Sequence, residues 1–315
     1  MHPAEPSLSA FPNPLVKYLA ATRPAFLSVT LVGCLIGQAS AHFSGFPLVL
    51  DKALVTLFFA LVAHAGVNVI NDYYDALNGS DAANRERAYP FTGGSRFIQN
   101  GVLSARAMAW FGYGLLAAVI PAGLWLMSRS GFELFWVGLG GLLLGWAYSA
   151  PPLRLMSRGL GELAIVAGWL LVVVGADLVQ RGSVALQPWL AGLPYALLVA
   201  NILFINQFPD RKADAVAGKR TLVVRLGPEE AKWGYLAVTA LAYGLILFLV
   251  ARSMLPIHAA AGAFALPLSF HAARQLLAHA SHPAGLVPAI KLSILAANLG
   301  GLLLAAGLYC SAKPL

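Results

Sequence analysis

Apolar segments long enough to cross a lipid bilayer recur along the whole chain, and this pattern constrains the fold more than any other feature. A membrane-spanning helix needs about 20 mainly apolar residues. We identify about nine such segments, and we expect each to form a transmembrane helix. They lie near 25–43, 53–77, 104–128, 132–149, 160–180, 186–208, 230–251, 255–276 and 286–310. The sequence therefore predicts an all-α, polytopic membrane protein.

The composition agrees with a membrane protein built as one unit. Hydrophobic residues make up 59% of the chain and charged residues only 11%, whereas about a quarter of the residues of a soluble domain are charged. No linker divides the sequence, so we expect a single transmembrane domain over 1–315. The opening stretch "MHPAEPSLSAFPNP" lacks the basic and apolar regions of a signal peptide, and we interpret 1–14 as a flexible tail.

The distribution of lysine and arginine predicts the orientation in the membrane. If the loops alternate between the two sides, 16 of the 21 lysines and arginines fall on one side. The positive-inside rule makes that side cytoplasmic, together with the N-terminus, and an odd number of helices puts the C-terminus outside. The same rule, with attraction to anionic membrane lipid, accounts for the net charge of +8 without nucleic acid as a partner.

A polar stretch, "NVINDYYDALNGSD" (68–81), stands where the second apolar segment ends. Residues spaced three, four and seven apart share one face of a helix. The residues that fit this stripe are His64, Asn68, Asn71, Asp72 and Asp75. Asp81 follows "NGS", whose asparagine and glycine favour a turn that ends the helix. The sequence therefore predicts one polar face at the cytoplasmic end of this helix.

A second polar stretch, "NQFPDRKADAVAGKRTLVVRLG", follows the sixth apolar segment. Asn206, Asp210 and Asp214 recur every four residues, which places them on one face if the backbone stays helical. Pro209 removes a helical hydrogen bond, so the register beyond it stays open. The chain thus carries two stripes of asparagine and aspartate, each followed by a basic loop.

Carboxylates gathered at membrane depth repel one another unless a cation lies among them. Oxygen ligands suit a hard divalent cation, and Mg²⁺ binds through one or two carboxylates together with phosphate oxygens and water. Basic residues beside the stripes are candidates for anchoring a phosphate. They are Arg85, Arg87, Arg96, Arg154, Lys219 and Arg220. Together these residues indicate a diphosphate held at the membrane surface.

Two other interpretations of the stripes stay open. Acid–base pairs at a helix end can be a solvated rim, and buried acids also mark the ion pathways of secondary transporters. Transporters usually place their sites near the midplane of the membrane, between broken helices. Both stripes here lie at cytoplasmic helix ends beside basic loops, which favours capture of a phosphorylated lipid.

These motifs resemble those of the UbiA superfamily of intramembrane prenyltransferases. The family's N-D-x-x-D motif with a further aspartate matches 71–81, and its D-x-x-x-D motif matches Asp210 and Asp214. The segment "YSAPPLRLMSRGLGE" (148–162) is similar to the family's Y-x-x-P-P segment. The resemblance extends from Arg23 to the last apolar segment. It implies about nine helices around a central cavity and transfer of a polyprenyl group from an isoprenoid diphosphate to an aromatic acid.

The resemblance also implies roles for individual residues, with two Mg²⁺ ions bridging the aspartate motifs and the diphosphate. The implied metal ligands are Asn71, Asp72, Asp75, Asp81, Asp210 and Asp214. The implied catalytic residues are Asp72, Asp75, Asp210, Asp214 and Tyr148. The implied substrate-binding residues are Asn68, Asn71, Asn206, Lys219, Arg220, Arg96 and Arg154. For Tyr148, a membrane-interface anchor is an equal alternative. For His64, a hydrogen bond inside the bundle is favoured over contact with the acceptor.

One departure from the family pattern points to a branch. Asp75 and Asp81 are six residues apart, whereas four is usual in enzymes that prenylate 4-hydroxybenzoate. The form "NDYYDALNGSD", with "TGGSR", "NQFPD" and "GKRTLVVRLG", resembles the menaquinone branch, which acts on 1,4-dihydroxy-2-naphthoate. This implies a bacterial inner-membrane enzyme, with 4-hydroxybenzoate or homogentisate as alternative acceptors. The spacing leaves open whether Asp81 reaches the metal.

Overall fold

A computed structural model describes residues 4–312, which form helices and connecting turns and no β-strand. The long α-helices are α2 (Pro24–Phe43), α3 (Leu50–Asn78), α5 (Ala105–Ser130), α6 (Glu133–Ser149), α7 (Gly161–Arg181), α8 (Gln187–Val216), α10 (Pro228–Ala251), α11 (Leu266–His279) and α12 (Val287–Cys310). The short elements are η1 (Leu8–Ala10), α1 (Pro14–Ala21), α4 (Ser80–Ala83), η2 (Leu155–Arg158), α9 (Leu222–Leu226), η3 (Ile257–Ala265) and η4 (Pro283–Leu286).

The predicted all-α membrane fold is confirmed. Among the described residues, seven helices are long and apolar enough to cross a membrane, namely α2, α3, α5, α7, α8, α10 and α12 with η4. The other two predicted spans are also helical but shorter. Helix α6 has 17 residues, and the span predicted over 255–276 begins as the 3₁₀-helix η3 before it continues as α11. The number of nine spans is therefore approximate.

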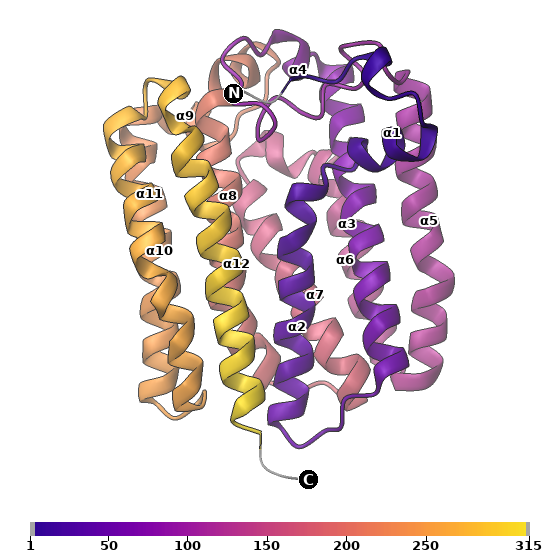
Figure 1. Cartoon of the computed structure of the whole chain (residues 1–315), viewed down its shortest axis with the longest axis vertical. Helices are drawn as coiled ribbons and strands as arrows, with labels where there is room; N and C mark the ends of the chain where they lie inside the picture. The colour runs from indigo at the N-terminus through magenta and orange to yellow at the C-terminus, as the bar shows by residue number, and fades with distance from the viewer. Residues whose placement is uncertain (1–3, 313–315) are drawn as a thin grey trace.

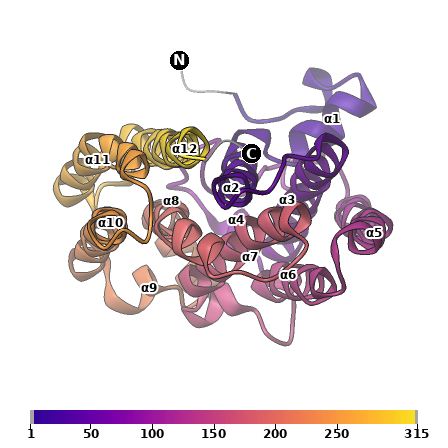
Figure 2. The ribbon, with the colours of Figure 1, turned by 90° about the horizontal axis from the view of Figure 1, so that it is seen from below.

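The helices form two groups on either side of α8 (Figure 2). Helices α2, α3, α5, α6, α7 and α8 surround a cavity. Helices α10 and α12 pack against α8 away from the cavity, and α11 packs against α10 and α12. Buried side chains such as Tyr195, Ile246 and Leu304 join the two groups in one apolar core. The cavity thus lies among the first six long helices.

Helix α8 continues through Pro209 to Val216, which resolves the register that the proline leaves open. Pro209 is buried, and α8 packs against α2, α7, α10 and α12. Packing on several sides compensates for the backbone hydrogen bond that proline cannot donate. Asp210 and Asp214 therefore stay in the helix and lie one turn apart.

Helix α3 ends at Gly79, whose φ of +84° lies in the left-handed region that glycine adopts without strain. The chain then forms the short helix α4, which carries Asp81. Helices α1, α4 and α9 lie at one end of the bundle, and α12 finishes at the opposite end (Figure 1). We refer to the end that holds α1, α4 and α9 as the polar end.

Part of the stretch interpreted as a tail packs on the polar end. Residues 1–3 lie outside the described residues, but the Glu5 carboxylate accepts hydrogen bonds from Arg87 Nε at 2.6 Å and from Asn100 Nδ2 at 3.2 Å. Burial raises the pKa of Glu5, but these hydrogen bonds and the charges of Arg87 and Arg96 together bring it below its ordinary value. Glu5 thus pairs with the loop after α4.

Candidate active site

A cavity of about 560 Å³ opens among α2, α3, α5, α6, α7 and α8. Apolar side chains line most of it, whereas the wall at the polar end is charged and polar. The residues that line this end include Arg23, Asn68, Asn71, Asp75, Asp81, Asn84, Asn206, Asp210, Asp214 and Lys219. A volume of this size is typical of a small-molecule site. The cavity therefore combines a polar mouth with an apolar interior.

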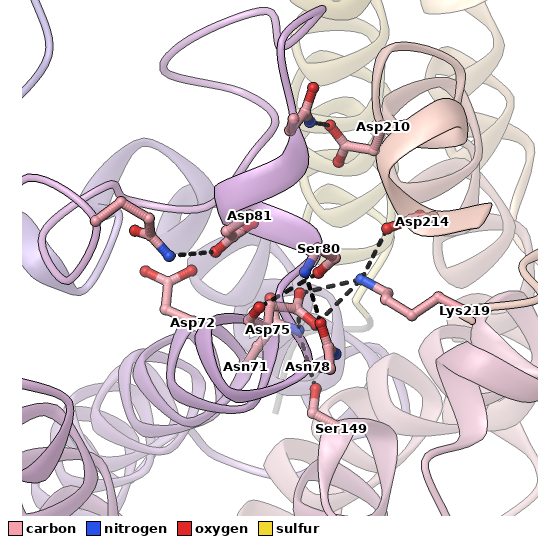
Figure 3. Close-up of polar contacts among 12 residues, drawn as sticks. Asn71, Asp72, Asp75, Asn78, Ser80, Asp81, Ser149, Asp210, Asp214 and Lys219 are labelled. Atoms are coloured by element: carbon pink, nitrogen blue, oxygen red, sulfur yellow. Dashed lines mark hydrogen bonds and ion pairs between the residues drawn. The ribbon is translucent and has the colours of Figure 1, made fainter. Parts of the chain in front are cut away.

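Lys219 joins the two aspartate motifs at this mouth (Figure 3). Its Nζ donates to both carboxylate oxygens of Asp75 at 3.1 Å and lies 3.2 Å from Asp214 Oδ1. All three side chains are buried. Burial lowers the pKa of Lys219, but the surrounding carboxylates raise it above its ordinary value, so the side chain stays an ammonium. The stripes of α3 and α8 thus converge, as the sequence predicts.

Neighbouring amides hold Asp75 in place. Asn71 Nδ2 donates to Asp75 Oδ2 at 3.1 Å, and Asn78 Nδ2 donates to Asp75 Oδ1 at 3.1 Å (Figure 3). Asn71 Nδ2 also donates to Ser149 Oγ at 2.9 Å, which fixes it against the end of α6. These bonds restrict the rotation of the carboxylate and fix the direction of its oxygens.

The longer spacing before Asp81 still brings this residue to the cavity. Asp81 is buried, and Gln99 Nε2 donates to its Oδ2 at 3.5 Å, while Arg96 donates to its backbone carbonyl. Gly94, with a φ of +71°, lies so close that an added Cβ would stand 2.2 Å from Asp81 Oδ2. Burial, followed by the charges of Asp75 and other carboxylates, raises the pKa of Asp81 well above its ordinary value.

The other aspartates of the motifs have different surroundings. Asp210 lines the cavity and accepts a hydrogen bond from Asn84 Nδ2 at 2.6 Å. Asp72 is buried but does not line the cavity. Its Oδ2 accepts from Ser95 N at 3.0 Å, and its Oδ1 lies 3.9 Å from Arg23 Nη1. In this structure Asp72 therefore supports the loop after α4 and Arg23 rather than the cavity wall.

The donor set at the mouth fits Mg²⁺. Asp75, Asp81, Asp210 and Asp214 supply only oxygen ligands, and Asn206 Oδ1 is buried with no hydrogen-bond partner among the described residues. Among residues 4–312, no group of three or more acidic, histidine or cysteine side chains is placed so that it could hold a metal ion by itself. Mg²⁺ does not require one, since it keeps waters and uses phosphate oxygens as ligands.

The remaining predicted residues divide into two groups. Tyr148 and Asn68 line the cavity, and Asn68 Nδ2 donates to the carbonyl of Thr22 at 3.0 Å. The structure does not bring Arg96, Arg154 or Arg220 to the cavity. Arg96 contacts Glu5 and the backbone of Asp81, and the other two side chains are exposed. Lys219 is thus the one predicted phosphate-binding cation that lies in the cavity wall.

Sequence reasoning missed Arg23, which lines the cavity beside Asp72. It stands directly before α2, with a φ of +58°, and its Nη2 donates to the carbonyl of Phe91 at 2.8 Å. A cation at a helix N-terminus opposes the helix dipole, where an acidic or neutral capping side chain is usual. That local mismatch was the signal available in the sequence.

Comparison with known proteins adds independent observations. A profile of the UbiA prenyltransferase family matches residues 26–310. The 1,4-dihydroxy-2-naphthoate octaprenyltransferase of Escherichia coli (strain K12) is 28% identical over 307 residues, which cover 93% of this chain and 95% of that protein. The protein of the same name from Bacillus subtilis (strain 168) is 28% identical over 235 residues, which cover 73% of this chain and 72% of that protein.

Solved structures share the fold. The structure of a UbiA homolog from Archaeoglobus fulgidus bound to GPP and Mg²⁺ has a TM-score of 0.59 and 19% sequence identity, covering 91% of this chain and 99% of that one. At this identity the likeness concerns the fold alone. The same bundle of helices therefore occurs in a protein that binds an isoprenoid diphosphate and magnesium.

Proposed function

We propose that this chain, which belongs to the UbiA prenyltransferase family, transfers a polyprenyl group from its diphosphate to 1,4-dihydroxy-2-naphthoate. Family membership makes it an enzyme that transfers prenyl groups. The acceptor is the proposed part, supported by the names of the Escherichia coli and Bacillus subtilis relatives and by the "NDYYDALNGSD" spacing. The observation that carries the proposal is the polar mouth, where Lys219 and four aspartates stand at the end of an apolar cavity.

The residues at the mouth have different roles in binding the diphosphate. Lys219 and Arg23, the two lysine or arginine residues among 4–312 that line the cavity, would contact its oxygens. Asp75, Asp81, Asp210 and Asp214 would hold two Mg²⁺ ions, which supply positive charge to the leaving diphosphate.

Other residues would support these ligands. Asn71 and Asn78 keep the Asp75 carboxylate oriented. Asp72 would act indirectly, because it contacts Arg23 and Ser95.

The apolar interior determines which nucleophiles can reach the reacting carbon of the prenyl group. The C–O bond of the allylic diphosphate breaks with both electrons leaving on the diphosphate, and an electron-rich ring carbon forms the new C–C bond. With 1,4-dihydroxy-2-naphthoate the new bond replaces the carboxylate, which leaves as CO₂. The apolar walls exclude water that would otherwise capture the allylic cation. A cavity without these walls would hydrolyse the substrate instead of prenylating the ring.

Acceptor competition tests the proposal. The purified protein in lipid nanodiscs would receive a labelled polyprenyl diphosphate, Mg²⁺ and each of 1,4-dihydroxy-2-naphthoate, 4-hydroxybenzoate and homogentisate. We expect kcat/KM to be highest for the naphthoate, by about 100-fold or more, since a site built for one set of polar groups discriminates strongly. Equal or better turnover of either other acid would overturn the acceptor assignment. A secondary transporter, the alternative from a different class, has no support from the family match.

We also propose that the polar end faces the cytoplasm of a bacterium and that α12 ends outside the inner membrane. The bias of lysine and arginine supports this orientation. Single cysteines would be introduced as Lys212→Cys at the polar end and Arg252→Cys at the other end, in a Cys310→Ser background. In intact cells, an impermeant maleimide should label the second variant and not the first. The reverse pattern would overturn the orientation.

The close contact between Gly94 and Asp81 leads to a further expectation. Gly94→Ala should lower turnover by about 10- to 100-fold, because the new Cβ would displace the Asp81 carboxylate by an ångström or more. Gly101→Ala is the matched control, since Gly101 has a similar φ of +69° but open space around it. Both variants carry left-handed strain, so Gly101→Ala measures the part of any change in thermal unfolding and turnover that this strain alone causes. Equal activity of the two variants would show that the position of Asp81 is unimportant.

A further inference from the structure

Polar side chains also occur deeper in the cavity, away from the aspartates. His64 on α3, Thr30 on α2 and Trp169 on α7 all line the cavity wall. His64 lies seven residues before Asn71 on α3, which corresponds to about 10 Å along the helix axis. Beyond it, the cavity-lining residues of the next two turns are Ala63, Ala60 and Phe59. His64 therefore stands at the border between the polar mouth and the apolar interior.

The three side chains form one cluster. The Nδ1 of His64 lies 2.8 Å from Thr30 Oγ1, and the imidazole meets the Trp169 ring edge to face with centroids 5.1 Å apart. These contacts fix the orientation of the imidazole. The sequence analysis favours a hydrogen bond inside the bundle for His64, and the contact with Thr30 matches that interpretation. It occupies only one of the two ring nitrogens.

The cluster keeps one buried donor without a protein partner. The His64 imidazole has two polar neighbours, Thr30 at Nδ1 and Asn68 one turn further along α3. Trp169 Nε1, in contrast, is buried and has no hydrogen-bond partner among residues 4–312. Because the indole N–H can only donate, its partner must carry a lone pair. A buried donor left unpaired destabilises the protein, and a ligand that accepts a hydrogen bond from it would remove that cost.

The chemistry of the two substrates decides which of them this cluster suits. A polyprenyl tail has no atom that accepts or donates a hydrogen bond, so it gains nothing from His64 or Trp169. The ring of a hydroxylated aromatic acid carries several oxygens. It must also lie next to the diphosphate-bearing carbon, between the mouth and the tail, and His64 stands at that level of the cavity.

We propose that His64, Thr30 and Trp169 form the subsite that binds an oxygen of the aromatic acceptor and so presents its ring carbon to the allylic carbon. His64 Nε2 and Trp169 Nε1 contact the acceptor oxygen, and Thr30 acts as a positioning residue that holds the imidazole through Nδ1. The inference rests on the proposed prenyl transfer to an aromatic acid. It adds the residues that recognise the acceptor.

Steady-state kinetics with two varied substrates test the subsite. His64→Phe keeps the ring volume and the contact with Trp169 but removes both nitrogens. We expect it to raise KM for 1,4-dihydroxy-2-naphthoate about 10-fold, with KM for the polyprenyl diphosphate within about 2-fold of the wild type. His64→Gln keeps a donor and an acceptor and should restore most of the affinity. Ser28→Ala, which removes a hydroxyl from α2 outside the cavity lining, should leave the acceptor KM unchanged.

Each other outcome has a distinct meaning. If His64→Phe changes the KM for the diphosphate or the preferred chain length, and not the acceptor KM, the cluster belongs to the tail and the inference is wrong. If His64→Phe does not fold, Thr30→Val removes a single hydroxyl and should raise the acceptor KM several-fold; an unchanged KM would overturn the proposal. A wild-type protein that prenylates none of the aromatic acids would instead contradict the proposed function.

Discussion

Asp75→Ala is expected to lower Mg²⁺-dependent prenyl transfer by about 1000-fold or more, while the protein still folds in detergent. Asp75 faces Lys219 with both carboxylate oxygens and is held by Asn71 and Asn78, so it is the most strongly oriented carboxylate of the mouth. Removing one preorganised group that stabilises developing charge costs about 100- to 1000-fold in turnover. The loss here should be at the upper end, because the substitution also leaves Lys219 with fewer anionic partners.

The measurement is turnover at saturating diphosphate and acceptor, with thermal unfolding recorded on the same preparation. Asp51→Asn is the matched control, because Asp51 stands on the same helix, is exposed and lies at the opposite end of the bundle. Its turnover should stay within about 2-fold of the wild type, since an exposed ion pair such as that with Arg129 contributes little. Near-normal turnover of Asp75→Ala would rule out the diphosphate site at this mouth.

The sequence predicts the helices and the two aspartate stripes well, because both depend on short-range patterns. Apolar length defines a membrane span, and spacing of three or four residues defines a helix face. The proximity of Asp75 and Asp214 could also be expected, because carboxylates from two stripes that gather at membrane depth need a cation among them. Pro209 was the point where local rules left the outcome open, and packing around α8 decides it.

The basic residues were harder to predict, because a lysine or arginine in a polar loop carries no signal of which way it points. Arg154 and Arg220 are exposed, whereas Arg23 reaches the cavity through a left-handed turn before α2. The contact between Asn84 and Asp210 joins residues 126 positions apart. Such pairs depend on how the loop after α4 folds over the bundle, and no local spacing encodes that.

Lys219→Met is expected to lower prenyl transfer by about 100-fold or more and, in addition, to make the stability of the protein depend on Mg²⁺. Without the ammonium, Asp75 and Asp214 lose the cation between them, and like charges at short distance destabilise the fold. In EDTA the variant should therefore unfold at a lower temperature than the wild type. Added Mg²⁺ without substrate should raise the unfolding temperature of the variant more, because a ligand that binds only the folded state stabilises it.

Two comparisons separate this effect from a general loss of charge. Lys212→Met removes an exposed lysine of α8 that pairs with Glu86, and it should change neither turnover nor the response to Mg²⁺. Lys219→Arg keeps the charge, so it should recover the stability in EDTA but only part of the turnover, since a planar guanidinium differs from a compact ammonium in its contacts. If Lys219→Met responds to Mg²⁺ as the wild type does, the carboxylates that Lys219 contacts are not the ones that hold the metal. Lys219 forms ion pairs with both aspartate stripes, so that result would mean that these ion pairs are not part of the metal site and that Asp81 and Asp210 hold the metal instead.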